Sequence, residues 1–251
     1  MSRAQPEQQA PPVQRLRVRY AKRGRMRFTS HRDFSRAFER ALVRARVPMA
    51  YSSGFNPHPR ISYAGASPTG SASEAEYLEI GLAQVLDPAD VARTLAGSLP
   101  PGLDVVEVAD VATARTGGLT ELLEASLWRV ETDLPVDAAR AGVADFLALE
   151  SVPVERMTKK GLRTFDCRAA VLHLEVGDAE VDDAGRPGST LDLLLRHTVP
   201  SVRPDDVLTG MRSAAELPAP DRMLLTRLAQ GPLTPAEDGL EDPLATAPTP
   251  G

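Results

Sequence analysis

The order of two hydrophobic periodicities along residues 15–108 restricts this chain to a few topologies. Apolar and basic residues alternate over 15–20, the period-two pattern of a half-buried strand. Apolar residues recur every three to four positions over 31–46, which predicts an amphipathic helix. Further patterns predict strands at 60–64 and 76–82, a helix at 87–98 and a strand at 103–108. The predicted order is β-α-β-β-α-β, the split βαβ or ferredoxin-like arrangement.

The second half of the chain is predicted to repeat this order with one extra strand. Elements are expected as strands at 127–134, 151–158, 165–176, 190–198 and 223–228, with helices opened by Pro135 and Pro204. No residue-level repeat accompanies the similar order. We therefore predict an α+β protein built from two ferredoxin-like halves packed together.

Shifts in composition divide the chain into five parts. Residues 1–14 and 231–251 are rich in Pro, Ala, Thr and Glu without periodicity, which predicts disordered tails. Between the tails we expect a basic ferredoxin-like half at 15–111, a linker at 112–125 and an acidic α+β half at 126–230.

Charge is distributed unequally along the chain. The first 60 residues contain 14 Lys or Arg and three acidic residues, a net charge of +11. Residues 61–251 contain 15 basic and 31 acidic residues, a net charge of −16. Such segregation gives one surface a field that attracts polyanions. The amino-terminal half is therefore where we expect a binding partner.

Composition excludes several classes of protein. No apolar run reaches the roughly 18 residues of a membrane span, and the start of the chain lacks the apolar stretch of a secretory signal. We therefore expect a cytoplasmic protein that does not bind a membrane. The single cysteine, Cys167, excludes an internal disulfide, a CxxC zinc site and a protein-held iron–sulfur cluster. We expect no cofactor, no metal and a buried, unreactive thiol.

The helix predicted at 31–46 carries arginines at four-residue spacing on its solvent side. Like charges at this spacing repel each other, so helix stability alone does not favour them, whereas a polyanion would relieve the repulsion. A solvated arginine-rich face is the alternative interpretation. The residues expected to contact nucleic acid are Lys22, Arg23, Arg25, Arg27, Arg32, Arg36, Arg40 and Arg44.

A second nucleic-acid hypothesis concerns the sheet face opposite the helices, which RNA-recognition modules use. Arg15, Arg17 and Arg19 would occupy this face, with Tyr77 and Glu79 on the neighbouring strand. Stacking needs two or three aromatic residues, and this face supplies one. We therefore favour a salt-bridged face, in which Glu79 pairs with Arg17 and the second half covers both.

His31, Asp33 and His58 are the candidates for a catalytic or small-anion site. His31 and Asp33 lie at a predicted helix N-terminus, which favours negative charge. His58 would join them if its loop folded over this terminus, and the three could then perform acid–base chemistry or weakly ligate a metal. Helix capping and loop hydrogen bonds are the competing roles. The candidate binding loop consists of Gly54, Phe55, Asn56, Pro57, His58, Pro59 and Arg60.

Two isolated arginines of the acidic half, Arg168 and Arg203, are candidates for a buried ion pair or a specific anion contact. Lys159 and Lys160 precede a glycine and are interpreted as a hairpin turn.

Several motifs together resemble a known family. They are Ser30-His-Arg-Asp33, Val47-Pro-Met-Ala-Tyr-Ser52, Gly54-Phe-Asn-Pro-His-Pro-Arg-Ile-Ser62 and Ser73-Glu-Ala-Glu-Tyr77. The chain is similar to the radical SAM-linked protein family, an uncharacterised bacterial domain found C-terminal to radical SAM proteins or encoded apart from them. The resemblance covers about residues 15–230.

This resemblance implies an accessory role, because one cysteine cannot supply the Cys-x-x-x-Cys-x-x-Cys motif of a radical SAM enzyme. We favour binding over catalysis: the protein is expected to present RNA or an RNA–protein substrate to a modifying enzyme, with a radical SAM or RNA-processing protein as partner. Two alternatives stay open. One is a small-anion or acid–base site at His31, Asp33 and His58, and the other is a protein-docking subunit.

Overall fold

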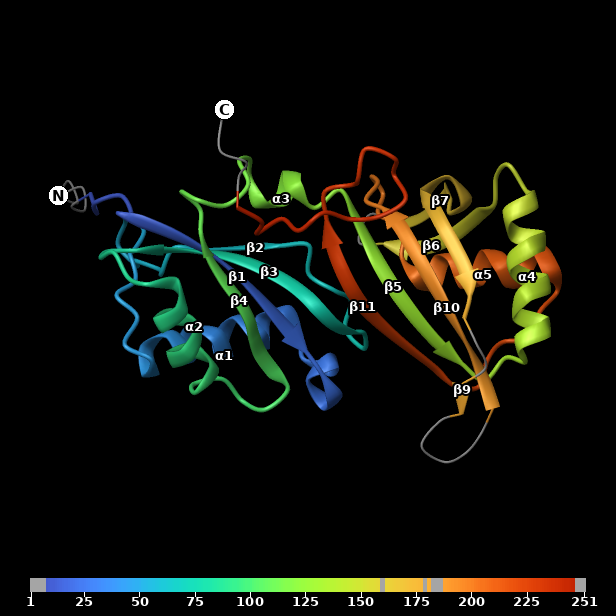
Figure 1. The fold of residues 1–251 in the computed structure, drawn as a ribbon, viewed down its shortest axis with the longest axis horizontal. Coiled ribbons are helices and arrows are strands. Elements are labelled where there is room, and N and C mark those ends of the chain that lie inside the picture. The colour runs from blue at the N-terminus through green and yellow to red at the C-terminus, as the bar shows by residue number, and fades with distance from the viewer. Residues whose placement is uncertain (1–7, 159–160, 178–179, 182–186, 247–251) are drawn as a thin grey trace. The chain divides into compact units, whose positions relative to one another are not determined.

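The computed structural model describes residues 8–158, 161–177, 180–181 and 187–246, and shows an α+β protein (Figure 1). The described chain forms two compact units. Unit 1 contains the residues up to Leu122 and those from Pro243 onward, and unit 2 is Leu123–Asp242. No helix in the described ranges is long and apolar enough to cross a membrane.

Unit 1 contains an antiparallel sheet with its first strand in the middle. In chain order its elements are β1 (Gln14–Lys22), η1 (Gly24–Phe28), α1 (His31–Arg44), β2 (Ile61–Ala64), β3 (Ala72–Leu82), α2 (Pro88–Ala96), β4 (Leu103–Asp110) and α3 (Leu119–Leu122). β1 pairs with β4 on one side and β3 on the other, and β2 pairs with β3. The strand order is therefore β4-β1-β3-β2.

The core of unit 1 lies between this sheet and helices α1 and α2. Leu16 and Val18 of β1 are fully buried, as is Phe38 of α1. Tyr20 stacks on Phe34, with 4.3 Å between the ring centroids. Alternate β1 residues therefore point to the helices, and the arginines between them lie on the opposite face.

Helix α1 begins where the sequence predicts. The Ser30 hydroxyl accepts a hydrogen bond from the Asp33 backbone N–H at 3.2 Å and donates one to the Asp33 carboxylate at 2.7 Å. The helix ends at Arg44, two residues earlier than predicted, and Arg46 adopts a left-handed φ of 54°. A left-handed residue cannot continue a right-handed helix, so the helix ends before Arg46, close to the predicted end.

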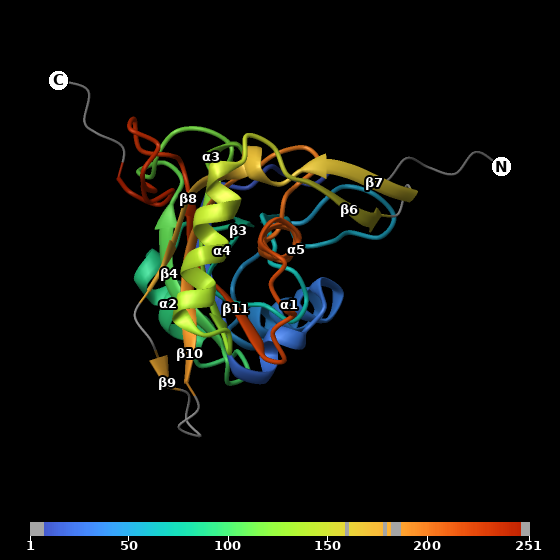
Figure 2. The same cartoon turned by 90° about the vertical axis from the view of Figure 1, so that its right-hand side faces the viewer.

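Unit 2 also has its first strand in the middle of an antiparallel sheet. Its elements are β5 (Ala125–Thr132), α4 (Val136–Ala148), β6 (Pro153–Thr158), β7 (Gly161–Asp166), η2 (Arg168–Ala170), β8 (Val171–Val176), β9 (Glu180–Val181), β10 (Pro187–Arg196), α5 (Pro204–Ala215) and β11 (Met223–Gly231). β5 lies between β11 and β10, and β8 pairs with β10. β6 and β7 form a separate hairpin. Figure 2 shows α4 and α5 side by side, and their apolar residues share one core with β10.

The strand predicted at 165–176 is wrong as a single element. β7 ends at Asp166, and β8 begins at Val171 after a turn of 3-10 helix. The Asp166 carboxylate accepts hydrogen bonds from the backbone N–H groups of Val152 and Arg168, both at 2.9 Å. This local capping turns the chain between the strands. Lys159 and Lys160 lie outside the described residues.

The segments predicted as tails at 1–14 and 231–251 and as a linker at 112–125 form defined contacts where they are described. At the amino-terminal end, the Val13 N–H donates to the Leu82 carbonyl at 2.9 Å, and Gln14 begins β1. Leu233 bridges to Leu240 within unit 2. In unit 1, Thr246 bridges to Ala114, and Leu244 is only 3% exposed. The carboxyl-terminal segment thus returns to unit 1 and covers part of it.

Candidate nucleic-acid interface

The solvent face of α1 carries a row of exposed arginines. Phe34, Phe38 and Leu42 occupy the buried face of the helix, which leaves the four-residue arginine series in solvent. Within the described ranges, no ion pair involves the members of what we call the α1 arginine row: Arg32, Arg36 and Arg40. Glu39 is exposed on the same helix and Asp33 is engaged by Ser30.

Arg44, the fourth arginine of the predicted series on this helix, contacts the segment that follows α2 and is not part of the α1 arginine row. Its Nη1 donates a hydrogen bond to the Ser98 carbonyl at 2.9 Å, just beyond the end of α2. Arg46, which sequence reasoning did not select, is exposed.

The preceding 3-10 helix adds basic and aromatic groups. Arg25 is exposed, and the Arg27 guanidinium lies 4.5 Å from the centroid of the Phe28 ring. Phe28 is 59% exposed. Sequence reasoning missed Phe28, although an aromatic residue that breaks a basic run is a signal for base stacking. We call Arg25, Arg27, Phe28 and the α1 arginine row together the η1–α1 surface.

Two of the predicted phosphate contacts have other environments. Lys22 is buried at the end of β1. Arg23 forms ion pairs with Glu74 and, at 3.0 Å, with Asp104. The hydrogen bond to Glu74 raises the pKa of Arg23. Both residues are therefore left out of the η1–α1 surface.

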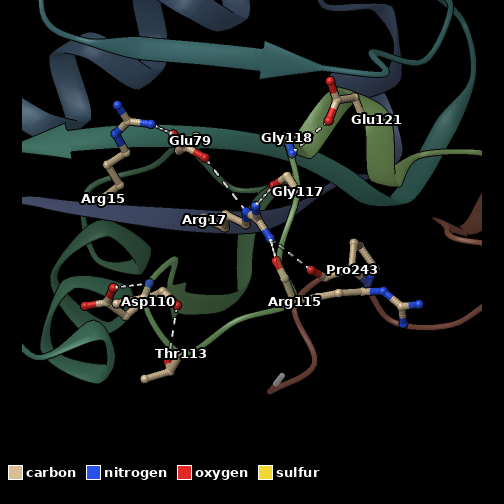
Figure 3. Close-up of polar contacts among 11 residues, drawn as sticks. Arg15, Arg17, Glu79, Asp110, Thr113, Arg115, Gly117, Gly118, Glu121 and Pro243 are labelled. Atoms are coloured by element: carbon tan, nitrogen blue, oxygen red, sulfur yellow. Dashed lines mark hydrogen bonds and ion pairs between the residues drawn. The ribbon is translucent and has the colours of Figure 1, made fainter. Parts of the chain in front are cut away.

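Arg17 lies at the centre of the sheet face opposite the helices (Figure 3). It is 1% exposed. Its two Nη groups donate hydrogen bonds to the carbonyl oxygens of Arg115 at 2.8 Å, Gly117 at 2.5 Å and Pro243 at 3.4 Å. Its Nε lies 3.8 Å from a Glu79 oxygen, so the predicted pairing with Glu79 is confirmed.

This face does not provide the stacking platform of an RNA-recognition module at its centre. Tyr77, its aromatic residue, is 2% exposed. The cover over Arg17 comes from residues 115–117 and from Pro243, all of unit 1. The sequence predicted that the second half covers Arg17, and it did not predict a cover from residues 115–117 and Pro243. These residues were expected to lie in a linker and in a disordered tail.

The structure does not bring His31, Asp33 and His58 into contact. The Asp33 carboxylate is hydrogen-bonded to Ser30. The His31 ring packs edge-on against Tyr63, with 4.8 Å between the centroids. His58 is exposed, and no hydrogen bond or ion pair in the described chain links any two of the three residues. No proton relay is therefore formed by this group.

The candidate binding loop is closed at its base. The His58 backbone N–H donates to the Ser52 hydroxyl at 3.0 Å, and the Ser52 N–H donates to the His58 carbonyl at 2.9 Å. Gly54 has a φ of 128°, which favours glycine at the turn. Phe55 at the tip is 67% exposed. The loop presents its side chains outward.

In unit 2 the buried ion pair joins Arg156 and Asp206, which sequence reasoning did not select. Arg156 also donates to the Ser201 carbonyl at 2.8 Å, and burial raises the pKa of Asp206. Arg203 is exposed at the start of α5, where its backbone N–H donates to Asp206. Arg168 is half-buried and donates to the Val171 carbonyl at 3.2 Å. Neither predicted arginine forms an ion pair within the described chain.

Cys167 is fully buried in unit 2, and burial raises the pKa of its thiol to about 12. We expect Ellman's reagent to leave the folded protein unlabelled at pH 8 and to react with one thiol per chain in urea. Because the folded pKa lies above the ordinary value of 9.0, the contribution of this group to stability is complete below pH 9 and is lost as the pH rises toward 12. Rapid labelling without urea would contradict the buried position.

No three His, Cys, Asp or Glu side chains converge as metal ligands do, as far as the described residues extend. Residues 15–204 match the model of a family described as "Uncharacterized protein conserved in bacteria (DUF2344)". No curated protein matches the chain.

Proposed function

Because the chain belongs to DUF2344, a family of uncharacterised proteins conserved in bacteria, we propose its function from geometry: it is an accessory protein that binds RNA or an RNA–protein substrate through the η1–α1 surface. The bound substrate is presented to a modifying enzyme. The partner is proposed to be a radical SAM protein, from the resemblance to radical SAM-linked proteins, or an RNA-processing protein, from the basic η1–α1 surface. The proposed setting is the cytoplasm.

One observation carries this proposal: Arg32, Arg36 and Arg40 lie in a row on the exposed face of α1 without carboxylate partners in the described chain. Mutual repulsion of like charges at this spacing costs a few tenths of a kcal/mol per pair, and phosphate groups remove this cost. Phosphate binding also releases counterions, which is the main source of affinity for nucleic acid.

The exposed Phe28 supports single-stranded RNA as the substrate class. Bases of single strands stack on exposed aromatic rings, whereas bases inside a duplex are not accessible to them. Phe28 already has an arginine over one face of its ring, and arginines and aromatic rings act together in single-strand binding.

We also infer that each unit is a ferredoxin-like half. The strand orders β4-β1-β3-β2 in unit 1 and β11-β5-β10-β8 in unit 2 are equivalent. In each unit the first strand lies between the last strand and the strand that corresponds to β3, which is β10 in unit 2. Unit 2 would then differ by the hairpin of β6 and β7, inserted after α4.

Salt dependence tests the proposed function. Five phosphate contacts to a single strand, one for each arginine of the η1–α1 surface, predict a slope of about −3.5 in a plot of log association constant against log salt concentration, since each contact contributes about −0.7. Fluorescence anisotropy with a labelled single-stranded RNA of mixed sequence measures this slope. A slope near zero would contradict phosphate binding. Copurified partners that survive nuclease treatment would instead favour protein docking.

A further inference from the structure

A pocket of about 260 Å³ lies on the face of the unit 1 sheet that α1 and α2 leave uncovered. It is lined by Pro12, Arg15, Arg60, Ile61, Ser62 and Glu79. These residues come from the segment before β1, from β1 itself, from the start of β2 and from β3. The pocket is separate from the η1–α1 surface, because α1 packs on the other face of the sheet.

Glu79 retains unused hydrogen-bonding capacity on the wall of this pocket. Its oxygens lie 3.6 Å from Arg15 Nη1 and 3.8 Å from Arg17 Nε (Figure 3). Both distances are too long for hydrogen bonds. The Glu79 side chain is only 19% exposed, and Arg17 Nε is buried without a hydrogen-bond partner. A neutral donor supplied by a ligand would satisfy the Glu79 carboxylate.

Two guanidinium groups line the same pocket. Arg60 uses Nε to donate to the Tyr51 carbonyl at 3.1 Å, which leaves its two Nη groups for a ligand. The Arg15 side chain is 60% exposed, and among the described residues its ion contact is the long approach to Glu79. Guanidinium groups bind carboxylate and phosphate oxygens in two-pronged hydrogen bonds.

Gly81 allows the walls of the pocket to approach each other. A Cβ at this position would lie 3.0 Å from Pro12 Cβ and 3.3 Å from Arg60 Cβ. The Gly81 backbone N–H donates to the Arg60 carbonyl at 2.9 Å. The glycine therefore holds Arg60 against β3, and the position of its guanidinium depends on this close packing.

We propose that this pocket binds a small oxyanion, a carboxylate or a phosphate ester, that carries an adjacent hydroxyl group. The oxyanion binds Arg15 and Arg60, and the hydroxyl donates to Glu79 beside Ser62. Arg15, Arg17 and Arg60 outnumber the single carboxylate, so a ligand with an ammonium group is disfavoured. The volume lies below the roughly 300 Å³ at which pockets for drug-sized ligands begin, which indicates a ligand smaller than a nucleotide.

Calorimetric titration of the full chain tests this proposal with two matched pairs of probes. Lactate is compared with propionate, and glycerol 3-phosphate with inorganic phosphate; the first of each pair carries the hydroxyl. We expect at least one hydroxyl-bearing probe to bind about tenfold more tightly than its partner, because a hydrogen bond to a charged group contributes about 1.5 kcal/mol or more. The pair that shows this preference identifies the oxyanion as carboxylate or phosphate.

Variants distinguish binding in this pocket from non-specific attraction of anions to exposed arginines. Arg15→Gln with Arg60→Gln should weaken binding of the preferred probe at least about tenfold, whereas Arg93→Gln, an exposed arginine of α2, should leave it unchanged. Both sets change only exposed side chains, and circular dichroism checks their fold. Absence of binding to all four probes at 10 mM, roughly the weak limit for a specific site, would overturn the proposal. Equal binding by the double variant and the wild type would do the same.

Discussion

Replacing Arg17 with Ala is expected to destabilise unit 1 by about 3–5 kcal/mol, the cost of removing one partner from a buried charged network. Three carbonyl oxygens, from Arg115, Gly117 and Pro243, would lose their donors, and Glu79 would lose one of its two cations. Residues 115–117 and Pro243 would still cover the site, so water could not enter to donate hydrogen bonds to these carbonyl groups. Hydrogen exchange of the β1 and β3 amides should accelerate by about 100-fold or more, as expected when local opening costs about 3 kcal/mol less.

Arg15→Ala is the matched control for this experiment. Arg15 lies on the same strand and contacts the same Glu79, but its side chain is 60% exposed. Exposed ion pairs contribute about 1 kcal/mol or less, so exchange should change by less than about fivefold. Similar exchange rates in the two variants would contradict a structural role for Arg17. Arg17→Lys should fail to restore protection, because one ammonium cannot reach the separate carbonyl groups as a guanidinium fork does.

Gly210→Val is expected to destabilise unit 2 by about 3 kcal/mol, the upper part of the range for overpacked cores. A Cβ at Gly210 would lie 2.6 Å from Cys167 Sγ and 2.9 Å from Val152 Cγ1. All three residues are buried where α5 meets the core, so none can move into solvent. Urea unfolding followed by fluorescence of Trp128, the only tryptophan, reports this unit directly.

A second substitution tests whether the clash with Cys167 causes the destabilisation by Gly210→Val. Cys167→Ala removes the nearest atom, so it should recover about 1 kcal/mol of the loss in the Gly210→Val background while destabilising the wild type. Gly97→Ala is the control, because the atoms nearest to a Cβ at Gly97 lie 3.8 Å away in the preceding helix, α2. It should be neutral or slightly stabilising. Additive effects of the substitutions at positions 167 and 210 would contradict direct packing.

Much of the fold could be predicted from local patterns. The alternation in β1, the capping pair at Ser30 and Asp33, and the spacing of Phe34 and Phe38 each depend on neighbours within a few residues. The strand predicted at 165–176 failed for a physical reason: Asp166 caps backbone groups on both sides of a turn, and an apolar run does not reveal this.

The candidate interface could be predicted only where its residues lie on one helix. The α1 arginine row follows from i, i+4 spacing, but the ion pairs of Arg23 link it to positions more than 50 residues away. The cover over Arg17 includes Pro243, which is 226 residues distant in the chain. Arg156 and Asp206 likewise meet only through the packing of the hairpin on α5. Such long-range contacts leave no local pattern in one sequence.

The central claim is that the η1–α1 surface binds RNA. Its most direct test is the affinity of the double variant Arg36→Glu/Arg40→Glu for single-stranded RNA at 0.1 M salt. Each lost contact removes about fivefold at this concentration, so the double variant should bind about 25-fold more weakly and with a shallower salt slope. The control is Arg140→Glu with Arg212→Glu, which makes the same charge change at exposed positions on α4 and α5. Its affinity should fall by less than about threefold, since neither residue belongs to the η1–α1 surface and salt screens charges that make no direct contact with the RNA. Equal losses in the two double variants, or none in either, would contradict the assignment of RNA binding to the η1–α1 surface.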